Sequence, residues 1–263
     1  MTALDFRIVI PSRLGSTRLP NKPLLDVAGK PLVVRCLESA LRAGARDVVV
    51  ATDDDRIAEV VRAAGGDVQL TRADHPSGTD RLAEVARLRG WPDDSIVVNL
   101  QGDEPLVPPA LFASLAAQLV SHPHAGIATL ATPIRTRAEL TSPNAVKVVL
   151  RDDGLALYFS RATIPFARDA QAPAPRGTAD ADALPAGLPY LRHLGLYAYR
   201  VATLHRFVAL GHHPLEGLEQ LEQLRPLAAG IGIHVTVLEH APPPGVDTQE
   251  DLARAVAAFE ELA

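Results

Sequence analysis

The sequence concentrates three cations in a short loop near its amino terminus, at Arg13, Arg18 and Lys22. Three unpaired charges cannot be buried together without a large cost, so they face solvent or an anion. The small residues at positions 15–17 allow backbone N–H groups to approach a phosphate closely. No Gly-Lys-Ser/Thr follows at the spacing of a Walker A loop. The loop is therefore either a solvated basic turn or an anion-binding loop of another kind.

Two aspartates provide the complementary chemistry, oxygen ligands for a hard cation. Asp103 lies in Gln-Gly-Asp-Glu-Pro directly after an apolar run at 95–100, and Asp247 precedes a carboxy-terminal helical stretch. Taken alone, Asp103 fits a turn beside a helix cap, and Asp247 fits a cap that Thr248 could provide equally well. Mg²⁺ usually takes one or two carboxylates beside phosphate oxygens and water. Together with a basic phosphate loop, Asp103 predicts a Mg²⁺ site, which Asp247 could share only if strands of one sheet bring the two carboxylates together.

The elements that must position these residues predict an α/β fold. Residues 6–10 form a short β-branched apolar run ended by Pro11, which is typical of a buried parallel strand. Further strands are expected at 47–52, 68–70 and 95–100. Helical patterns at 31–42, 56–64, 79–89 and 108–120 alternate with them. Such alternation indicates a parallel sheet with helical crossovers, so the basic loop leaves the carboxyl end of a central strand, where open sheets bind ligands.

The second half of the chain departs from that alternation. The strands expected there are 126–133, 145–150, 156–160 and 231–238. A hairpin turn is indicated by Asp-Asp-Gly at 152–154. Leucine recurs every three residues between 215 and 224, which predicts a helix with one apolar face. The segment 167–189 has almost no large apolar side chain, so we expect a mobile surface loop.

Several motifs resemble those of the 3-deoxy-manno-octulosonate cytidylyltransferase (CMP-KDO synthetase) family of sugar-activating enzymes. They are Pro-Ser-Arg-x-x-Ser-Thr-Arg-Leu-Pro-x-Lys-Pro-Leu from position 11, Ser-Gly-Thr-x-Arg from 77, Gln-Gly-Asp-Glu-Pro from 101, Tyr-Phe-Ser-Arg from 158, Arg-His-Leu-Gly from 192 and Glu-Gln-Leu-Arg from 222. The sequence departs from the family pattern at Asp80 and in a longer Ala/Pro-rich insertion after Arg168. These departures leave the details of sugar specificity open.

The resemblance implies a fold, a reaction and an assembly. The fold is a Rossmann-like nucleotide-diphospho-sugar transferase fold, with a mixed, mostly parallel sheet and helices on both faces. We expect one nucleotidyltransferase domain, with a nucleotide-binding half at about 1–125, a sugar-binding and dimerisation elaboration at about 126–240, and a carboxy-terminal metal aspartate and helix at 241–263. The implied reaction transfers CMP from CTP to the acidic eight-carbon sugar KDO with Mg²⁺ as cofactor, in a homodimer. Sialic acid or 8-amino-KDO as the sugar, or a nucleotide-binding regulator without turnover, remain alternatives.

The resemblance also implies roles for individual residues. The nucleotide-binding residues would be Pro11, Arg13, Ser16, Thr17, Arg18, Lys22, Ser77, Gly78, Thr79, Arg81 and Gln101. The sugar-binding residues would be Gln101, Arg161, His193, Tyr197, Glu222 and Gln223. The catalytic residues would be Arg13, Arg18, Lys22, Asp103 and Asp247, of which the two aspartates bind Mg²⁺. Without the resemblance, Arg161 is more typical of a surface charge and His193 of a hydrogen-bonded core histidine.

Composition sets the outer limits. A chain of 263 residues that is 47% hydrophobic can bury a full core as one α/β domain with an elaboration. A net charge of −5 argues against a general nucleic-acid partner, which would require clustered excess cations. The single cysteine, Cys36, is expected to be a small core residue and excludes an intramolecular disulfide. Neither a signal peptide nor an apolar run of about 18 residues is present, so a cytoplasmic protein is expected.

Overall fold

The computed structural model describes residues 4–15, 19–168, 184, 187 and 190–261. The chain divides into two compact units. Unit 1 comprises Met1–Ser121, Leu196–Ala209 and Pro242–Ala263, and unit 2 comprises His122–Gly195 and Leu210–Ala241. None of the helices in the described ranges combines the length and apolar character needed to cross a membrane.

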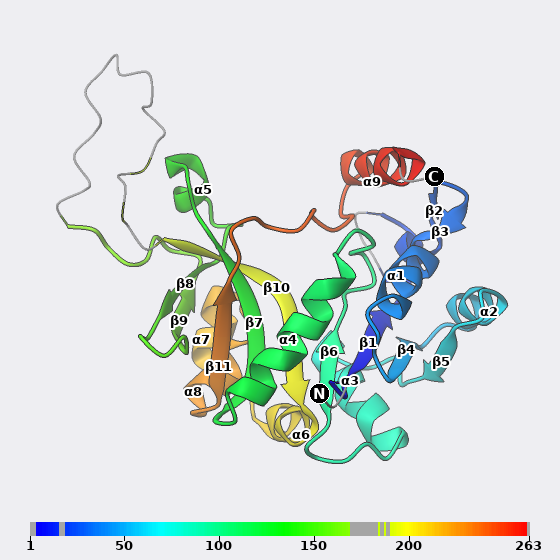
Figure 1. The fold of residues 1–263 in the computed structure, drawn as a ribbon, viewed down its shortest axis with the longest axis horizontal. Coiled ribbons are helices and arrows are strands. Elements are labelled where there is room, and N and C mark those ends of the chain that lie inside the picture. Colours follow the sequence, from blue (N-terminus) through cyan, green and yellow to red (C-terminus); the bar gives the residue numbers. More distant parts are fainter. Residues whose placement is uncertain (1–3, 16–18, 169–183, 185–186, 188–189, 262–263) are drawn as a thin grey trace. The chain divides into compact units, whose positions relative to one another are not determined.

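Unit 1 is built on a mostly parallel sheet, whose strands lie side by side in Figure 1 in the order β6-β1-β4-β5. The strands are β1 (Arg7–Ser12), β4 (Asp47–Thr52), β5 (Asp67–Leu70) and β6 (Ile96–Asn99). Strand β1 is parallel to both of its neighbours, β4 and β6. The last residues of β10 (Leu191–Arg200) pair with β6 in the antiparallel sense. Ile8, Val9 and Ile10 are fully buried, which confirms the predicted central parallel strand.

The predicted end of the first strand at Pro11 is wrong, because β1 continues through Pro11 to Ser12. The pairing of β1 with β6 stops at Val9 opposite Asn99, whereas its pairing with β4 continues to Ser12. Pro11 therefore lies where β1 has a strand partner on one side only, and a missing N–H is tolerated there. The basic loop consequently begins at Arg13.

Helices pack on both faces of the sheet of unit 1, as predicted. They are α1 (Leu32–Leu41), α2 (Asp55–Ala63), α3 (Gly78–Leu88), α4 (Pro109–Ser121), α6 (Val201–Ala209) and α9 (Gln249–Glu261). Helix α1 packs on β1, β4, α2 and α4, whereas α3 packs on β1, β4 and α6. A 3-10 turn, η1 (Lys22–Leu24), and a small hairpin of β2 (Asp26–Val27) and β3 (Lys30–Pro31) precede α1. Cys36 is fully buried within α1, which confirms its assignment to the core.

Unit 2 contains β7 (Ala125–Pro133), β8 (Lys147–Leu150), β9 (Ala156–Ser160), β11 (Gly232–Val237) and the first residues of β10. Its helices are α5 (Arg137–Thr141), α7 (Pro214–Glu219) and α8 (Leu224–Ala228). Strand β11 is parallel to β7, and β8 is antiparallel to both β9 and β10. The predicted hairpin between β8 and β9 is present, with Gly154 at a φ of 80° in its turn. This positive φ suits glycine, which has no Cβ to clash.

The prediction of one helix with an apolar face, made from the leucine repeat, is wrong. Helix α7 ends at Glu219, Gln220 adopts a left-handed conformation with φ 51°, and α8 begins only at Leu224. Leu218 is 82% exposed, whereas Leu221 is buried. A repeat of three residues does not match the 3.6 residues of an α-helical turn, so the leucines drift around the helix and cannot share one buried face.

Two predictions concern residues outside the described ranges. They are most of the expected mobile loop at 167–189, and Ser16, Thr17 and Arg18 of the basic loop. Their expected roles stay predictions.

Candidate active site

The two aspartates expected to bind metal converge on one cation. The Nζ atom of Lys22 lies 2.5 Å from Oδ2 of Asp103 and 2.9 Å from Oδ1 of Asp247. Asp103 follows β6 and Lys22 belongs to the segment after β1, two strands that are neighbours in the sheet. Asp247 comes from the far end of the sequence. The carboxylates are thus close enough to share an ion, as the Mg²⁺ hypothesis requires.

A main-chain contact brings Asp247 to this place. The backbone N–H of Val246 donates a hydrogen bond of 2.8 Å to the backbone oxygen of Asp103. A Cβ atom on Gly245 would lie 3.1 Å from that same oxygen, which is tighter than an ordinary contact. The close approach of the two chain segments therefore favours glycine at position 245.

The start of α9 leaves the carboxylate of Asp247 available for other partners. The side chain of Asp251 accepts hydrogen bonds from the backbone N–H groups of Asp247, at 3.0 Å, and Thr248, at 2.8 Å. The Thr248 hydroxyl in turn accepts from the Asp251 N–H at 3.2 Å. Thr248 and Asp251 together cap the helix. Asp247 is therefore not needed to cap α9, although the sequence allowed that interpretation.

The surroundings of this cluster shift two pKa values. Burial lowers the pKa of Lys22, but its hydrogen bonds to Asp103 and Asp247 outweigh that effect and raise the pKa, so the ammonium persists. Burial and the neighbouring Asp103 charge raise the pKa of Glu104 to about 8. The Oε2 atom of Glu104 is buried and has no hydrogen-bond partner among the described residues. Glu104 therefore retains its proton near neutral pH.

The donor set fits Mg²⁺. The single Lys22 ammonium cannot neutralise both carboxylates, so the Asp103 and Asp247 pair keeps a net negative charge. A further cation bound between this pair and a triphosphate would reduce the repulsion between them. In the described part of the chain, no group of three or more His, Cys, Asp or Glu side chains is arranged to hold a metal. Two carboxylates are nevertheless a sufficient protein contribution for Mg²⁺, which takes its other ligands from phosphate oxygens and water.

A cavity of about 350 Å³ opens beside these carboxylates. The expected nucleotide residues that line it are Pro11, Arg13, Lys22, Ser77, Gly78, Arg81 and Gln101. Thr79, also expected to contact the nucleotide, is buried in α3 and does not line this cavity. Ser77 caps that helix by accepting from the Asp80 N–H at 3.3 Å, and its hydroxyl donates to the Asp80 carboxylate at 2.6 Å. Asp80, the departure from the family pattern, thus orients Ser77.

Arg81 is held in this cavity by residues from two neighbouring strand ends. Its side chain is 4% exposed and pairs with Asp53 at 3.1 Å. Its Nη1 donates to the Thr71 hydroxyl at 2.5 Å. The next residue, Asp54, caps α2 by accepting from the Arg56 N–H. Asp53 is different, because its carboxylate positions Arg81.

In unit 2, the guanidinium of Arg161 is bound to main-chain oxygens. It donates to Glu219 at 2.7 Å, Pro143 at 2.8 Å and Gln220 at 3.3 Å. The Glu219 carboxylate accepts from the Arg161 backbone N–H at 2.9 Å and from the Ser160 hydroxyl at 2.6 Å. Arg161 therefore fastens the end of α7 to the end of β9, whether or not it also contacts a sugar.

His193 of β10 contacts one hydroxyl group and one aromatic ring. Its Nε2 lies 3.0 Å from the Thr129 hydroxyl, and its ring packs edge-on against Phe159 with the centroids 4.9 Å apart. Burial lowers its pKa to about 3. His193 is therefore neutral at physiological pH, and offers a sugar hydrogen bonds but no positive charge.

The other expected sugar residues lie in both units. Tyr197 of β10, in unit 1, stacks on Tyr199 with the ring centroids 5.7 Å apart. In unit 2, Glu222 and the buried Gln223 occupy the connection between α7 and α8. The Arg225 guanidinium of that motif binds the Glu216 carboxylate at 2.6 and 2.9 Å, and so fixes the connection.

Comparisons with known proteins agree with the motifs. The chain matches the sequence model of the cytidylyltransferase family over residues 7–234. It is 55% identical over 250 residues to the 3-deoxy-manno-octulosonate cytidylyltransferase of Hahella chejuensis (strain KCTC 2396), covering 95% of each chain. The chain belongs to the 3-deoxy-manno-octulosonate cytidylyltransferase family.

Two further relatives support this membership. The enzyme of that name from Pseudomonas syringae pv. syringae (strain B728a) is 55% identical over 254 residues, or 97% of each chain. The solved structure of a CMP:2-keto-3-deoxy-manno-octonic acid synthetase complexed with CTP superposes with a TM-score of 0.86 at 42% identity, covering 98% of this chain and 100% of the other. The mixed, mostly parallel α/β fold predicted from the motifs is thereby confirmed.

Several residues of this family member that shape the cavity escaped the sequence analysis. Asp53 was not among the expected site residues, although it pairs with Arg81. His75 lines the cavity and is bound to Glu84. For Asp53, the only signal in the sequence was its position directly after a predicted strand, where ligand-binding residues are expected. No local pattern links His75 to Glu84, since one lies in a loop and the other within α3.

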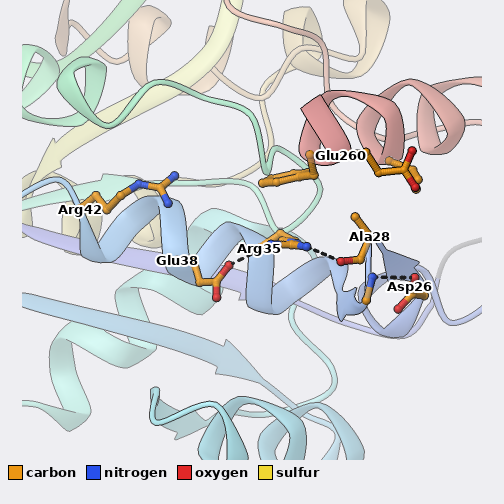
Figure 2. Close-up of a pocket in the computed structure, with 9 residues that line it drawn as sticks. Asp26, Ala28, Arg35, Glu38, Arg42 and Glu260 are labelled. Atoms are coloured by element: carbon orange, nitrogen blue, oxygen red, sulfur yellow. Dashed lines mark hydrogen bonds and ion pairs between the residues drawn. The ribbon is translucent and has the colours of Figure 1, made fainter. Parts of the chain in front are cut away.

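A larger hollow of about 740 Å³ lies along α1 and α9 (Figure 2). It shares no lining residue with the first cavity. Its Arg35 donates to the Ala28 carbonyl at 2.5 Å and to Glu38 at 3.4 Å, and stacks over Phe259 at 4.5 Å. These groups satisfy one another, and none belongs to the family motifs. The smaller cavity is therefore the candidate active site.

Proposed function

We propose that the protein activates KDO with CTP, forming CMP-KDO and releasing pyrophosphate, for use in lipopolysaccharide synthesis. Family membership at 55% identity to enzymes named for this reaction supports the proposal. A relative of similar fold is named as a complex with CTP. The observation that carries the proposal is the convergence of Asp103 and Asp247 on the Lys22 ammonium, in a cavity lined by the basic loop.

The reaction requires positioning and charge neutralisation more than covalent chemistry. The anomeric hydroxyl of the sugar attacks the α-phosphorus in line, and pyrophosphate leaves. Arg13 and Lys22, together with Arg18, would offset the triphosphate charge, while Arg81 and Ser77 bind the rest of the nucleotide. Asp103 and Asp247 would hold Mg²⁺, which when bound polarises phosphate oxygens and assists formation of the nucleophile. No protein general base is then required.

We assign the sugar to Gln101, Arg161, His193, Tyr197, Glu222 and Gln223. Because His193 is neutral, Arg161 is the one cation in this set, and its guanidinium would neutralise the sugar carboxylate while keeping its main-chain contacts. The proposal also includes a nucleotide-binding half at about 1–125, a sugar-binding and dimerisation elaboration at about 126–240 and a metal-binding segment at 241–263. A homodimer in the cytoplasm completes it, and the free, buried Cys36 is compatible with a reducing compartment.

Pyrophosphate release tests this function directly. The protein with CTP, Mg²⁺ and KDO should release pyrophosphate, and the protein with CTP and Mg²⁺ alone should not. Mass spectrometry of the product over a panel of KDO, 8-amino-KDO and sialic acid should find CMP on KDO. Efficient use of another sugar would change the assigned substrate. CTP binding without pyrophosphate release with any sugar would instead favour a nucleotide-binding regulator.

A further inference from the structure

A half-buried pair of His75 and Glu84 stands at the cavity wall and has no role in the mechanism above. The Nε2 atom of His75 lies 2.5 Å from Oε2 of Glu84 on α3. That same oxygen accepts the backbone N–H of Arg72 at 3.0 Å. Only 12% of the His75 side chain and 10% of the Glu84 side chain are exposed. His75 is among the residues that line the cavity.

The partners of Glu84 determine which ring nitrogen of His75 carries a proton. Burial opposes ionisation of Glu84, but the hydrogen bonds from His75 and Arg72 outweigh it and lower the Glu84 pKa. An ionised carboxylate accepts hydrogen bonds and cannot donate them, so Nε2 of His75 is the donor. A neutral imidazole protonated at Nε2 presents a lone pair at Nδ1. In the part of the chain that the structure describes, Nδ1 has no hydrogen-bond partner.

The topology of unit 1 indicates which part of a nucleotide reaches His75. Lys22, Asp103 and Asp247 define the phosphate end of the cavity. Asp103 follows β6, whereas His75 lies in the connection after β5, and these two strands are three positions apart in the order β6-β1-β4-β5. At a spacing of about 4.8 Å between strands, their ends are separated by roughly 14 Å. The connection that carries His75 is therefore placed for the base.

We propose that His75, oriented by Glu84, accepts a hydrogen bond from the exocyclic amino group of cytosine and thereby selects CTP over UTP. Cytosine carries an amino donor at the position where uracil carries an oxygen acceptor. The Nδ1 lone pair can accept a hydrogen bond from the cytosine amino group, whereas it would repel the uracil oxygen, which is itself an acceptor. His75 is then a specificity residue and Glu84 a positioning residue. This inference rests on the proposed function and concerns the same cavity.

Equilibrium binding of CTP and UTP by titration calorimetry at pH 8 tests the inference. His75→Ala should lower the preference for CTP over UTP by roughly tenfold, because one hydrogen bond is lost and CTP binds more weakly. His75→Phe keeps a ring in the same place and should lose the preference equally. An unchanged preference in both variants, or equal weakening of both nucleotides, would overturn the assignment of His75.

Two substitutions of Glu84 test its positioning role. Glu84→Leu removes the acceptor and should reduce the CTP preference as His75→Ala does. Glu84→Gln should retain it, because one amide oxygen can still accept from both Arg72 and His75. Loss of the preference in Glu84→Gln to the same extent as in Glu84→Leu would contradict this role.

A matched control and one further measurement separate the possible failures. Arg87→Ala changes an exposed residue of the same helix and should bind both nucleotides as the unmodified protein does. Because calorimetry needs no turnover, base selection is tested even if the unmodified protein releases no pyrophosphate. Absence of pyrophosphate release would count against the proposed function alone, whereas equal affinity of the unmodified protein for CTP and UTP would count against the role of His75.

Discussion

The basic cluster of unit 1 and the expected sugar-binding residues of unit 2 differ in what their cations bind. In unit 1, the Lys22 ammonium binds the side chains of Asp103 and Asp247. In unit 2, the Arg161 guanidinium binds three main-chain oxygens. The fully buried Lys147 behaves in the same way, because its ammonium donates to the backbone oxygens of Ser142, Ala145 and Arg161 at 2.9, 2.6 and 2.6 Å.

This difference separates charges that are exchangeable from charges that hold the fold. A side-chain ion pair can rearrange by rotamer changes when a ligand of opposite charge arrives. A cation bound to several carbonyls fixes the path of the main chain, and its removal leaves those carbonyls without their donor. We therefore expect substitutions in the unit 1 cluster to change turnover, and substitutions of Arg161 to change stability as well as sugar binding.

The largest expected effect is at the aspartate pair. Asp103→Asn and Asp247→Asn keep the side-chain size, and each should lower kcat at least ~100-fold, as expected when one preorganised electrostatic contact is lost. The double variant should lose little more than either single variant, because the two residues act as a unit. Steady-state pyrophosphate release measures kcat, and thermal unfolding should show folded variants. Near-normal kcat in either single variant would remove that aspartate from the site.

Arg161 provides the direct test of the comparison. Arg161→Ala should raise the sugar KM about tenfold while changing the CTP KM little, because a buried sugar carboxylate loses its counter-ion. Its free energy of unfolding should also fall by about 2 kcal/mol, since three carbonyls lose a donor. Arg161→Lys keeps the charge without the fork, so it should recover sugar binding better than stability. Equal changes in both KM values would refute the sugar assignment.

His193 predicts a pH dependence of stability. Its folded pKa of about 3 lies below the ordinary value of about 6.5, so the unfolded chain takes up the proton first as the pH falls. This contribution to stability is present in full above pH 6.5 and is lost progressively between pH 6.5 and 3. The loss reaches about 2 kcal/mol at pH 5. Urea unfolding at pH 7 and pH 5 should show a smaller pH effect in His193→Gln. His240→Gln, at an exposed site, should behave as the unmodified protein.

The smallest expected effect is at Asp53, which acts on the nucleotide through Arg81. Asp53→Asn replaces a charge-assisted hydrogen bond by a neutral one, and we expect the CTP KM to rise about fivefold with kcat nearly unchanged. Asp54→Asn is the matched control, because Asp54 caps α2 and pairs with Arg56, whereas the ion pair of Arg81 is with Asp53. If both variants change the CTP KM equally, the effect belongs to the helix cap and the role given to Asp53 fails.

Most elements of the fold were predictable because their signals are local. The run Ile8, Val9 and Ile10 has a strand pattern whatever surrounds it, and Asp54 or Ser77 caps a helix through atoms two or three residues away. The prediction failed at the leucine repeat, where Gln220 in a left-handed conformation ends α7. Spacing alone did not reveal that break, because the conformation of Gln220 depends on the contacts of its neighbours.

The sequence by itself determined the alternation of strands and helices in the first half of the chain, the residue types of the basic loop and the family to which the chain belongs. Only the tertiary structure decided which charges meet: Lys22 with two distant aspartates, Asp53 with Arg81, Glu84 with His75, and Arg161 with carbonyls. The physical reason is that local patterns arise from backbone geometry and burial within a few residues. A contact between separate segments instead exists only when the whole sheet has set the strand order and register. Each charge that packing removes from water then needs a partner of opposite charge or a hydrogen-bonding group close by.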